Sequence, residues 1–166
     1  MTGLSSSDYE ALLQRFPETR FAFAYGSGAI EQGGYSDRYT GDPADAPMLD
    51  LIFAVDDPIS WHLENKRLNP GHYTSLLSAL PHLSGTSNMA LTLNRWQAIV
   101  IAYFQEEYGA KVWFNAMVPM GIPSASKRLM KYGVISTTAL IEDMQNWHSL
   151  YIAGRLHKPI RVIYSN

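Results

Sequence analysis

The chain has 166 residues, of which 46% are hydrophobic and 17% charged, so it is long enough and apolar enough to bury the core of one globular domain. It contains no cysteine, which excludes disulfide bonds and thiolate metal sites. Its net charge of −2 at pH 7 argues against nucleic acid as a partner, because domains that bind nucleic acid are more often basic overall.

Charge is unevenly divided along the chain. Residues 1–64 carry 11 acidic and 3 basic side chains, whereas residues 65–166 carry 4 acidic and 10 basic ones. An acidic half that holds a divalent metal and a basic half that holds phosphates would produce this division. An uneven scatter of surface charge would produce it equally well.

The first part of the chain predicts two helices and two strands, with a long loop between the strands. Leu12, Leu13 and Phe16 recur at helical spacing after a run of serines, and Asp57 followed by Pro58 is typical of a helix start. A stretch rich in Gly, Pro and Asp indicates the loop. In chain order we expect a helix over 5–16, a strand over 20–25, a loop over 31–47, a strand over 48–55 and a helix over 56–68.

The rest of the chain predicts three further helices and three further strands. Gly109 and Gly154 are each placed to end a helix. The last helix presents one apolar stripe, made of Leu140, Met144, Trp147 and Tyr151. In chain order we expect a helix over 72–80, an irregular stretch over 83–95, a helix over 96–109, a strand over 110–118, a loop over 119–128, a strand over 132–136, a helix over 137–154 and a strand over 159–166.

These elements alternate irregularly, without a repeat or a linker, which predicts one mixed α/β (α+β) domain. The chain stops directly after a strand-like run, where a natural domain rarely ends. We therefore expect residues 1–166 to form one domain of a C-terminally truncated protein.

The stretch "FAFAYGSGAI", residues 21–30, ends an apolar run at Gly-Ser-Gly and can be tested against three familiar motifs. A Walker A loop requires G-x-x-x-x-G-K-[ST], which is absent. A dinucleotide fingerprint requires a third glycine, where the chain has Glu31. A nucleophile elbow requires glycines on both sides of Ser27, where the chain has Tyr25 and Ala29. The P-loop, dinucleotide and acyl-enzyme interpretations are therefore excluded.

A fourth pattern fits, in which a Gly-Ser turn ends one strand and the next strand carries carboxylates, as in nucleotidyltransferases of the polymerase-beta type. Here the turn is Gly26-Ser27-Gly28, and Asp50 lies within the otherwise apolar next strand. Backbone N–H groups and a hydroxyl bind phosphates, and acidic oxygens bind Mg²⁺. A metal would explain a carboxylate inside a strand, and a salt bridge to Arg38 is the alternative.

The pattern is incomplete in one respect. A second acid is usual two residues after the first, and Ile52 occupies that position. Asp56 is on the same face of the strand by alternation, but it is too far along to share a metal with Asp50 unless the strand bends.

Several longer strings carry a resemblance to a known family. They are "FAYGSG", "MLDLIFAVDDPISWH", "KYGVIST", "LIEDMQNW" and "LYIAGRLHKPI", in this order. Together they resemble the mitochondrial translocator-maintenance family of phosphatidate cytidylyltransferases, or CDP-diacylglycerol synthases, over most of residues 21–163.

The resemblance implies a polymerase-beta-like nucleotidyltransferase fold, with a central mixed sheet flanked by helices. It implies CTP as the nucleotide substrate, Mg²⁺ as the cofactor and phosphatidic acid at a membrane surface as the acceptor. The products would be CDP-diacylglycerol and pyrophosphate, which serve cardiolipin synthesis. It also implies a peripheral protein on the matrix side of the mitochondrial inner membrane. The sequence indicates no oligomeric state.

The hypothesis assigns a role to each candidate residue of the turn and the acidic strand. Ser27 and the N–H groups of Gly26 to Gly28 hold the triphosphate, and Asp50 binds Mg²⁺ with help from Asp56. Ser27 and Asp50 are thus the catalytic candidates. Tyr25 either packs on the nucleotide or is a core tyrosine.

Two groups of basic residues could bind the triphosphate or a lipid phosphate, or could be ordinary surface charge. They are Lys127, Arg128 and Lys131, and Arg155, Lys158 and Arg161. We favour Lys131 and Arg155 because they lie in the strings that carry the resemblance.

Other polar residues have two interpretations each. His62, Asn65 and Asn69 share one helix face, which would line the site or face solvent. We expect His72 to be structural and Asp143 to be an acid on a helix surface. Two other functions stay open from the sequence: a nucleotidyltransferase with a soluble acceptor, and a nucleotide-binding module without catalysis, which the missing acid at Ile52 would favour.

Overall fold

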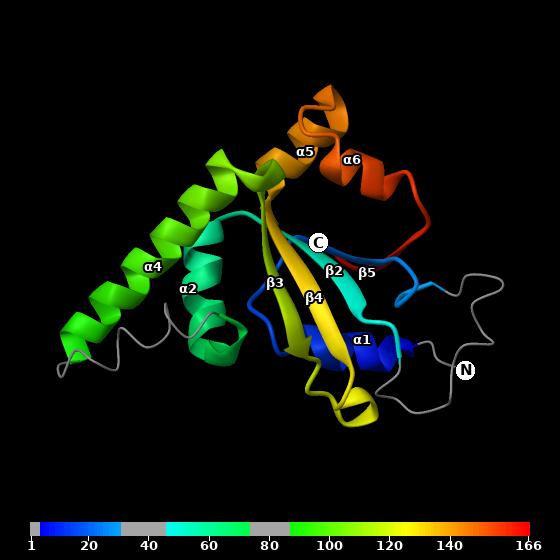
Figure 1. The fold of residues 1–166 in the computed structure, drawn as a ribbon, viewed down its shortest axis with the longest axis horizontal. Helices are drawn as coiled ribbons and strands as arrows, with labels where there is room; N and C mark the ends of the chain where they lie inside the picture. The colour runs from blue at the N-terminus through cyan, green and yellow to red at the C-terminus, as the bar shows by residue number, and fades with distance from the viewer. Residues whose placement is uncertain (1–3, 31–45, 74–86) are drawn as a thin grey trace.

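The computed structural model describes residues 4–30, 46–73 and 87–166 of the chain (Figure 1). The elements are α1 (Ser6–Leu13), β1 (Phe21–Tyr25), β2 (Leu49–Val55), α2 (Pro58–Leu68), the 3₁₀ turn η3 (Pro70–His72), α4 (Ser87–Glu107), η5 (Gly109–Lys111), β3 (Val112–Pro119), η6 (Pro123–Ala125), β4 (Leu129–Ser136), α5 (Thr137–Asn146), α6 (Tyr151–Leu156) and β5 (Ile160–Ser165).

A five-stranded mixed sheet forms the centre of the fold, with the strand order β3-β4-β2-β1-β5. β2 pairs in parallel with β4, and the other neighbouring strands are antiparallel. Helices flank the sheet, so the predicted mixed α/β (α+β) domain with a central mixed sheet is confirmed.

Each face of the sheet buries its own apolar cluster. On one face α1 and α2 cover the strands, and Phe16 packs against Phe53, Trp61 and Tyr132. On the other face α5 and α6 cover them, with Ile152 fully buried in the second cluster. This division follows from the two-residue alternation of side chains along each strand.

Two helix starts predicted from sequence are confirmed. Ser5 caps α1, because its hydroxyl accepts a hydrogen bond from the N–H of Asp8. In return, the Asp8 carboxylate accepts a hydrogen bond from the N–H of Ser5. Asp57 caps α2, where its carboxylate accepts hydrogen bonds from the N–H groups of Ile59 and Ser60.

The strands were predicted well, whereas the stretch before residue 96 was not. All five strands lie where the sequence placed them, although β4 begins three residues earlier than expected, at Leu129. The irregular stretch predicted over 83–95 is wrong from Ser87 onward, because α4 already begins there. Most of the predicted loop over 31–47 and of the predicted helix over 72–80 lies outside the described residues.

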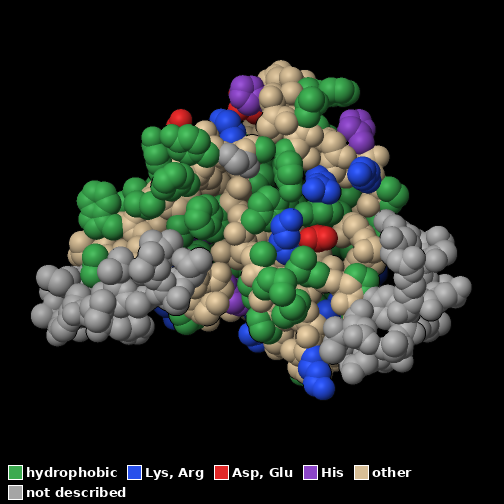
Figure 2. Space-filling model, in the orientation of Figure 1, with side chains coloured by type: hydrophobic (Ala, Val, Ile, Leu, Met, Phe, Trp, Pro, Cys, Tyr) green, Lys and Arg blue, Asp and Glu red, His purple; other side chains and the backbone are tan. Residues whose placement is uncertain are grey.

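α4 carries a row of apolar side chains on the face turned away from α2. Figure 2 shows hydrophobic side chains gathered over this helix. They are Trp96, Val100, Tyr103 and Phe104 of α4 and Tyr108 directly after it, with exposed fractions between 41% and 61%. The exposed carboxylate of Glu107 lies among them by helical spacing.

The single helix predicted over 137–154 is wrong, because the structure divides it into α5 and α6. The chain turns between them through Trp147 and Leu150, which have left-handed φ values of 54° and 58°. Asp143 causes the break: it is only 3% exposed, and its carboxylate accepts hydrogen bonds from N–H groups of the turn and of α6. Its expected role as a surface acid is therefore also wrong, and Gly154 lies within α6 rather than ending a helix.

The polar stripe of α2 neither faces solvent nor lines the candidate site. His62 and Asn65 are fully buried, and Asn69 is 7% exposed. His62 is hydrogen-bonded with Tyr73 and with Gln105 of α4, at 3.1 and 3.0 Å.

Asn65 extends this network to the sheet. Its side-chain amide donates to the hydroxyls of Tyr73 and Tyr132, the latter on β4. His72 is hydrogen-bonded with the same Tyr132 hydroxyl at 3.1 Å, so its expected structural role is confirmed. The network ties α2, α4 and η3 to the face of the sheet opposite Asp50.

The buried network predicts acid sensitivity. Burial lowers the pKa of His62 from 6.5 to about 4, so the folded protein binds fewer protons than the unfolded chain between these values. The free energy of unfolding should therefore fall as pH drops from about 6.5 to about 4, by on the order of 3 kcal/mol from His62 alone. Urea denaturation at stepped pH measures this slope.

His62→Gln, which cannot titrate, should reduce the slope without abolishing it, because burial also lowers the pKa of His72 to about 4. His148→Gln at an exposed position should leave the slope unchanged. An equal slope in His62→Gln and the wild type would show that His62 is not the group responsible.

Candidate functional site

The Gly-Ser-Gly turn directly follows β1 and lies against the start of β2. Gly26 has a left-handed φ of 75°, and its carbonyl accepts hydrogen bonds from the N–H groups of Ala29 and Ile30. A Cβ at Gly28 would overlap the backbone carbonyl of Met48. Glycine is therefore required at both positions, for a backbone angle at one and for a close approach at the other.

Arg128 binds the backbone of this turn. Its guanidinium donates to the carbonyl of Gly28 at 2.6 Å and to the carbonyl of Pro47 at 3.0 Å. The side chain is only 4% exposed, so Arg128 joins the turn to the entrance of β2 and is not surface charge. From the sequence, Arg128 was placed in a basic group that could bind phosphate. Its structural role could not be predicted, because the backbone carbonyls that it binds lie about 80 to 100 positions away in the chain.

Asp50 lies in the second position of β2, between Tyr25 of β1 and Lys131 of β4 in the strand register. Paired residues in register point to the same face of a sheet. Asp50 also lies beside the turn, since a Cβ on Gly26 would be 3.4 Å from its Oδ2. Burial raises the pKa of the Asp50 carboxyl above its ordinary value, and the charges of Lys131 and Arg155 oppose that rise.

The two basic residues favoured from sequence both reach this place. Lys131 Nζ lies 4.5 Å from the ring centre of Phe114. The guanidinium of Arg155 lies 5.0 Å from the ring centre of Tyr25 and 5.1 Å from that of Tyr151. Figure 2 shows an acidic side chain beside basic ones near the middle of this face. A ring face attracts a cation that lies over it, so these rings help to hold Lys131 and Arg155 in place.

The structure does not bring Asp56 to this group. Asp56 follows the last residue of β2, and the register of β2 with β1 and β4 is unbroken from Asp50 to Val55. Six residues of strand separate the two carboxylates by about 20 Å. Asp56 instead accepts a hydrogen bond from Arg20 at 2.7 Å and one from the Thr137 hydroxyl at 3.1 Å.

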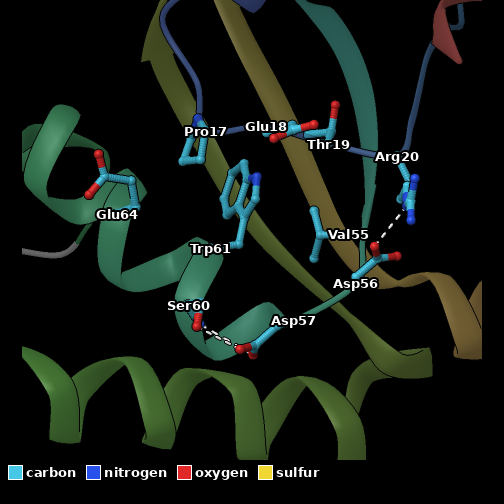
Figure 3. A pocket seen from close by; sticks show the side chains of 10 residues that line it. All are labelled: Pro17, Glu18, Thr19, Arg20, Val55, Asp56, Asp57, Ser60, Trp61 and Glu64. Carbon is cyan, nitrogen blue, oxygen red and sulfur yellow. Dashed lines mark hydrogen bonds and ion pairs between the residues drawn. The ribbon is translucent and has the colours of Figure 1, made fainter. Parts of the chain in front are cut away.

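A pocket of about 400 Å³ lies at the Asp56 end of the sheet, away from Asp50 (Figure 3). Three of the four carboxylates on its wall already have partners: Asp56 pairs with Arg20, Asp57 caps α2 and Glu64 forms an ion pair with Arg67. The residues that line it are Pro17, Glu18, Thr19, Arg20, Val55, Asp56, Asp57, Ser60, Trp61 and Glu64. We therefore place the candidate site at the glycine turn and not in this pocket.

Asp50 could bind a magnesium ion only if other ligands, such as substrate phosphates, bound the same ion. Among residues 4–30, 46–73 and 87–166, no group of three or more His, Asp and Glu side chains could hold a metal. Mg²⁺ commonly binds through one or two carboxylates together with substrate phosphates. A single carboxylate beside a phosphate-binding turn is compatible with that arrangement. Arg38, the alternative partner of Asp50, lies outside the described residues.

Two aromatic residues of the site were not singled out from the sequence for this role. Phe114 supports Lys131, and Tyr151 both lies under Arg155 and contacts Phe114 edge-on at 5.9 Å. The sequence placed Tyr151 on the apolar stripe of one long helix. Its role beside Arg155 could not be seen, because the predicted helix did not break before it.

Within the described part of the chain, no helix is both long enough and apolar enough to cross a membrane.

Comparisons with known proteins agree on one family. The family model described as "Phosphatidate cytidylyltransferase, mitochondrial" matches residues 9–166. Curated relatives with the same name include those of Danio rerio, 42% identical over 93% of this chain, and Homo sapiens, 40% identical over 95% of it. The relative of Drosophila melanogaster is 38% identical over 92% of the chain. These matches cover 38%, 29% and 40% of the relatives, so the chain spans about two fifths or less of their length.

Two glycines provide a matched test of the turn. Gly28→Ala should lower the free energy of unfolding by about 1–3 kcal/mol, because its Cβ would meet the Met48 backbone, which cannot swing away. Gly154→Ala in α6 should leave stability unchanged or raise it by up to about 1 kcal/mol, because the added Cβ meets nothing within 4 Å. Urea denaturation measures both, and equal midpoints would contradict the close approach at Gly28.

Proposed function

The chain belongs to the mitochondrial phosphatidate cytidylyltransferase family, and from this premise we propose that the protein transfers CMP from CTP to phosphatidic acid. The products are CDP-diacylglycerol and pyrophosphate. The observation that carries the proposal is the meeting of one carboxylate and two basic side chains, Asp50, Lys131 and Arg155, beside the glycine turn. This arrangement suits a reactant that brings phosphates and a metal together.

The turn and the basic residues bind the nucleotide. The N–H groups of Gly26 to Gly28 and the Ser27 hydroxyl hold oxygens of the triphosphate, because small residues allow phosphate to approach the backbone. Lys131 and Arg155 neutralise phosphate charge from the neighbouring strand and from α6. Tyr25 supports Arg155 by packing under its guanidinium.

Asp50 holds Mg²⁺ together with the triphosphate, and the ion supplies charge neutralisation at the phosphates. The raised pKa of Asp50 supports this role, since a partly buried carboxylate gains more from a cation than an exposed one does. With one carboxylate from the described residues, the affinity for the metal should depend on the nucleotide.

The reaction requires positioning more than proton transfer. A phosphate oxygen of phosphatidic acid attacks the α-phosphorus of CTP, and the bond from that phosphorus to the bridging oxygen of the β-phosphate breaks. The pair of electrons leaves with pyrophosphate. A phosphomonoester has a second pKa near 6, so the acceptor is already largely ionised at neutral pH and needs no strong general base. The chain contributes orientation and charge stabilisation.

We place the reaction at the matrix side of the mitochondrial inner membrane, with the protein bound peripherally. The names of the relatives, which include the word mitochondrial, support the organelle. The membrane surface is inferred from the acceptor, a lipid whose headgroup lies at the interface.

Asp50→Asn tests the proposed chemistry. It should lower CTP- and Mg²⁺-dependent pyrophosphate release on vesicles of phosphatidic acid in phosphatidylcholine by at least about a hundredfold, the scale for losing one preorganised electrostatic contact. The free energy of unfolding should stay equal or rise, because the variant no longer holds a carboxylate whose charge burial disfavours. Loss of activity would then not reflect loss of folding.

Asp56→Asn is the matched comparison at the far end of β2, and it should leave turnover unchanged. Calorimetry with CTP, ATP and GTP separately tests the choice of base. Turnover that survives in Asp50→Asn, or equal affinity for the three nucleotides, would contradict the proposal. Activity with soluble phosphomonoesters in place of vesicles would show that the acceptor is a soluble molecule and not a lipid.

A further inference from the structure

We propose that Asp143 is a positioning residue, which anchors α6 so that Arg155 is held over Tyr25 beside Asp50. The inference rests on the proposed function, because it concerns how that site acquires one of its phosphate-binding side chains. Asp143 itself lies in the last turn of α5 and binds the segment that leads into α6.

Both carboxylate oxygens of Asp143 are fully used. Oδ1 accepts from the N–H and hydroxyl of Ser149 and from the N–H of Leu150, at 2.7–2.8 Å. Oδ2 accepts from the N–H groups of Ile152 and Ala153, at 2.8 and 3.0 Å. One buried side chain thus satisfies N–H groups at the start of α6 that the helix itself cannot satisfy.

The anchored segment would not keep this shape unaided. Trp147 and Leu150 both adopt the left-handed conformation, which is unfavourable for side chains with a Cβ. α6 has only six residues, too few to be stable by itself. The hydrogen bonds of Asp143 therefore determine where α6 begins and how it is oriented.

Arg155 lies within one helical turn of the anchored N–H groups. Its guanidinium lies over the rings of Tyr25 and Tyr151 and donates to the Tyr151 hydroxyl at 3.4 Å. Ile152 and Ala153, the residues that Asp143 binds, are both buried, and Ile152 packs in the apolar cluster on this face of the sheet. A displacement of this turn would therefore move Arg155 away from Asp50 while the sheet stayed in place. Figure 1 shows α5 and α6 meeting through the turn above the strands.

Asp143→Asn removes the anchor with little change in size. An amide nitrogen cannot accept hydrogen bonds, so at least two N–H groups of the turn or of α6 lose their acceptor. We expect the affinity for CTP, measured by calorimetry with Mg²⁺, to fall several-fold. Arg155→Ala should weaken it by about tenfold or more, as expected for a charge-assisted hydrogen bond.

The double variant distinguishes positioning from a general structural role. If Asp143 acts through Arg155, then Asp143→Asn should have no further effect on CTP affinity in the Arg155→Ala background. Glu142→Gln, at the partly exposed neighbouring position of α5, is the matched control and should bind CTP as the wild type does. Independent, multiplying losses in the double variant would overturn the inference, as would unchanged affinity in Asp143→Asn.

A second readout does not depend on nucleotide binding. In NMR spectra the Nε–H signal of Arg155, assigned with Arg155→Lys, should show a ring-current shift from Tyr25 and Tyr151, and Asp143→Asn should abolish it. If Asp143→Asn does not fold, Ser149→Ala leaves the backbone contacts of Asp143 in place. It removes the hydroxyl contact with Asp143 and the acceptor of the Tyr151 N–H, and it should reduce the shift in part. A wild type that does not bind CTP would overturn the proposed function, whereas an unchanged shift in a folded Asp143→Asn would overturn the positioning role.

Discussion

The register of β2 between β1 and β4 is the constraint on which the rest of the structure depends. It places Tyr25, Asp50 and Lys131 in one row across three strands. A slip of one residue would turn Asp50 into the apolar cluster under α1 and α2 and would bring a leucine to the site. The row is fixed on both sides, because the parallel pairing with β4 and the antiparallel pairing with β1 are both continuous along β2.

Much of this fold follows from local sequence signals. The central strands β1, β2 and β4 were predictable because they are buried on both faces and are short apolar runs. Helix starts at Ser5 and Asp57 were predictable because capping depends on side chains within three residues. The longer strings also identified the family, and the glycine turn with the acid after it predicted where the candidate site lies.

What could not be predicted depends on contacts between distant segments. His62, Asn65 and Asn69 have the pattern of a polar helix face, yet they are buried. Tyr73, Tyr132 and Gln105 supply partners for His62 and Asn65 from other elements, and Asn69 donates to the carbonyl of Arg15. Arg128 was misjudged for the same reason, since it binds backbone carbonyls about 80 to 100 positions away. Asp143 was misjudged for another reason, because its partners lie six to ten positions away beyond a helix break that the sequence did not reveal. A polar residue is therefore predicted to be exposed when its hydrogen-bond partners are not close to it in the sequence.

The pairing of β2 with β4 has a consequence for the order of folding. Leu49 pairs with Met130, about 80 positions later, and Tyr25 pairs with Ile160, about 135 positions later. Contacts this distant become favourable only after long loops have closed, which makes them slow to form. During synthesis the glycine turn and Asp50 emerge from the ribosome well before Lys131 and Arg155. The candidate site therefore cannot assemble until the chain has been made at least as far as Arg155, and shorter unfinished chains would expose the apolar edge of β2 in the meantime.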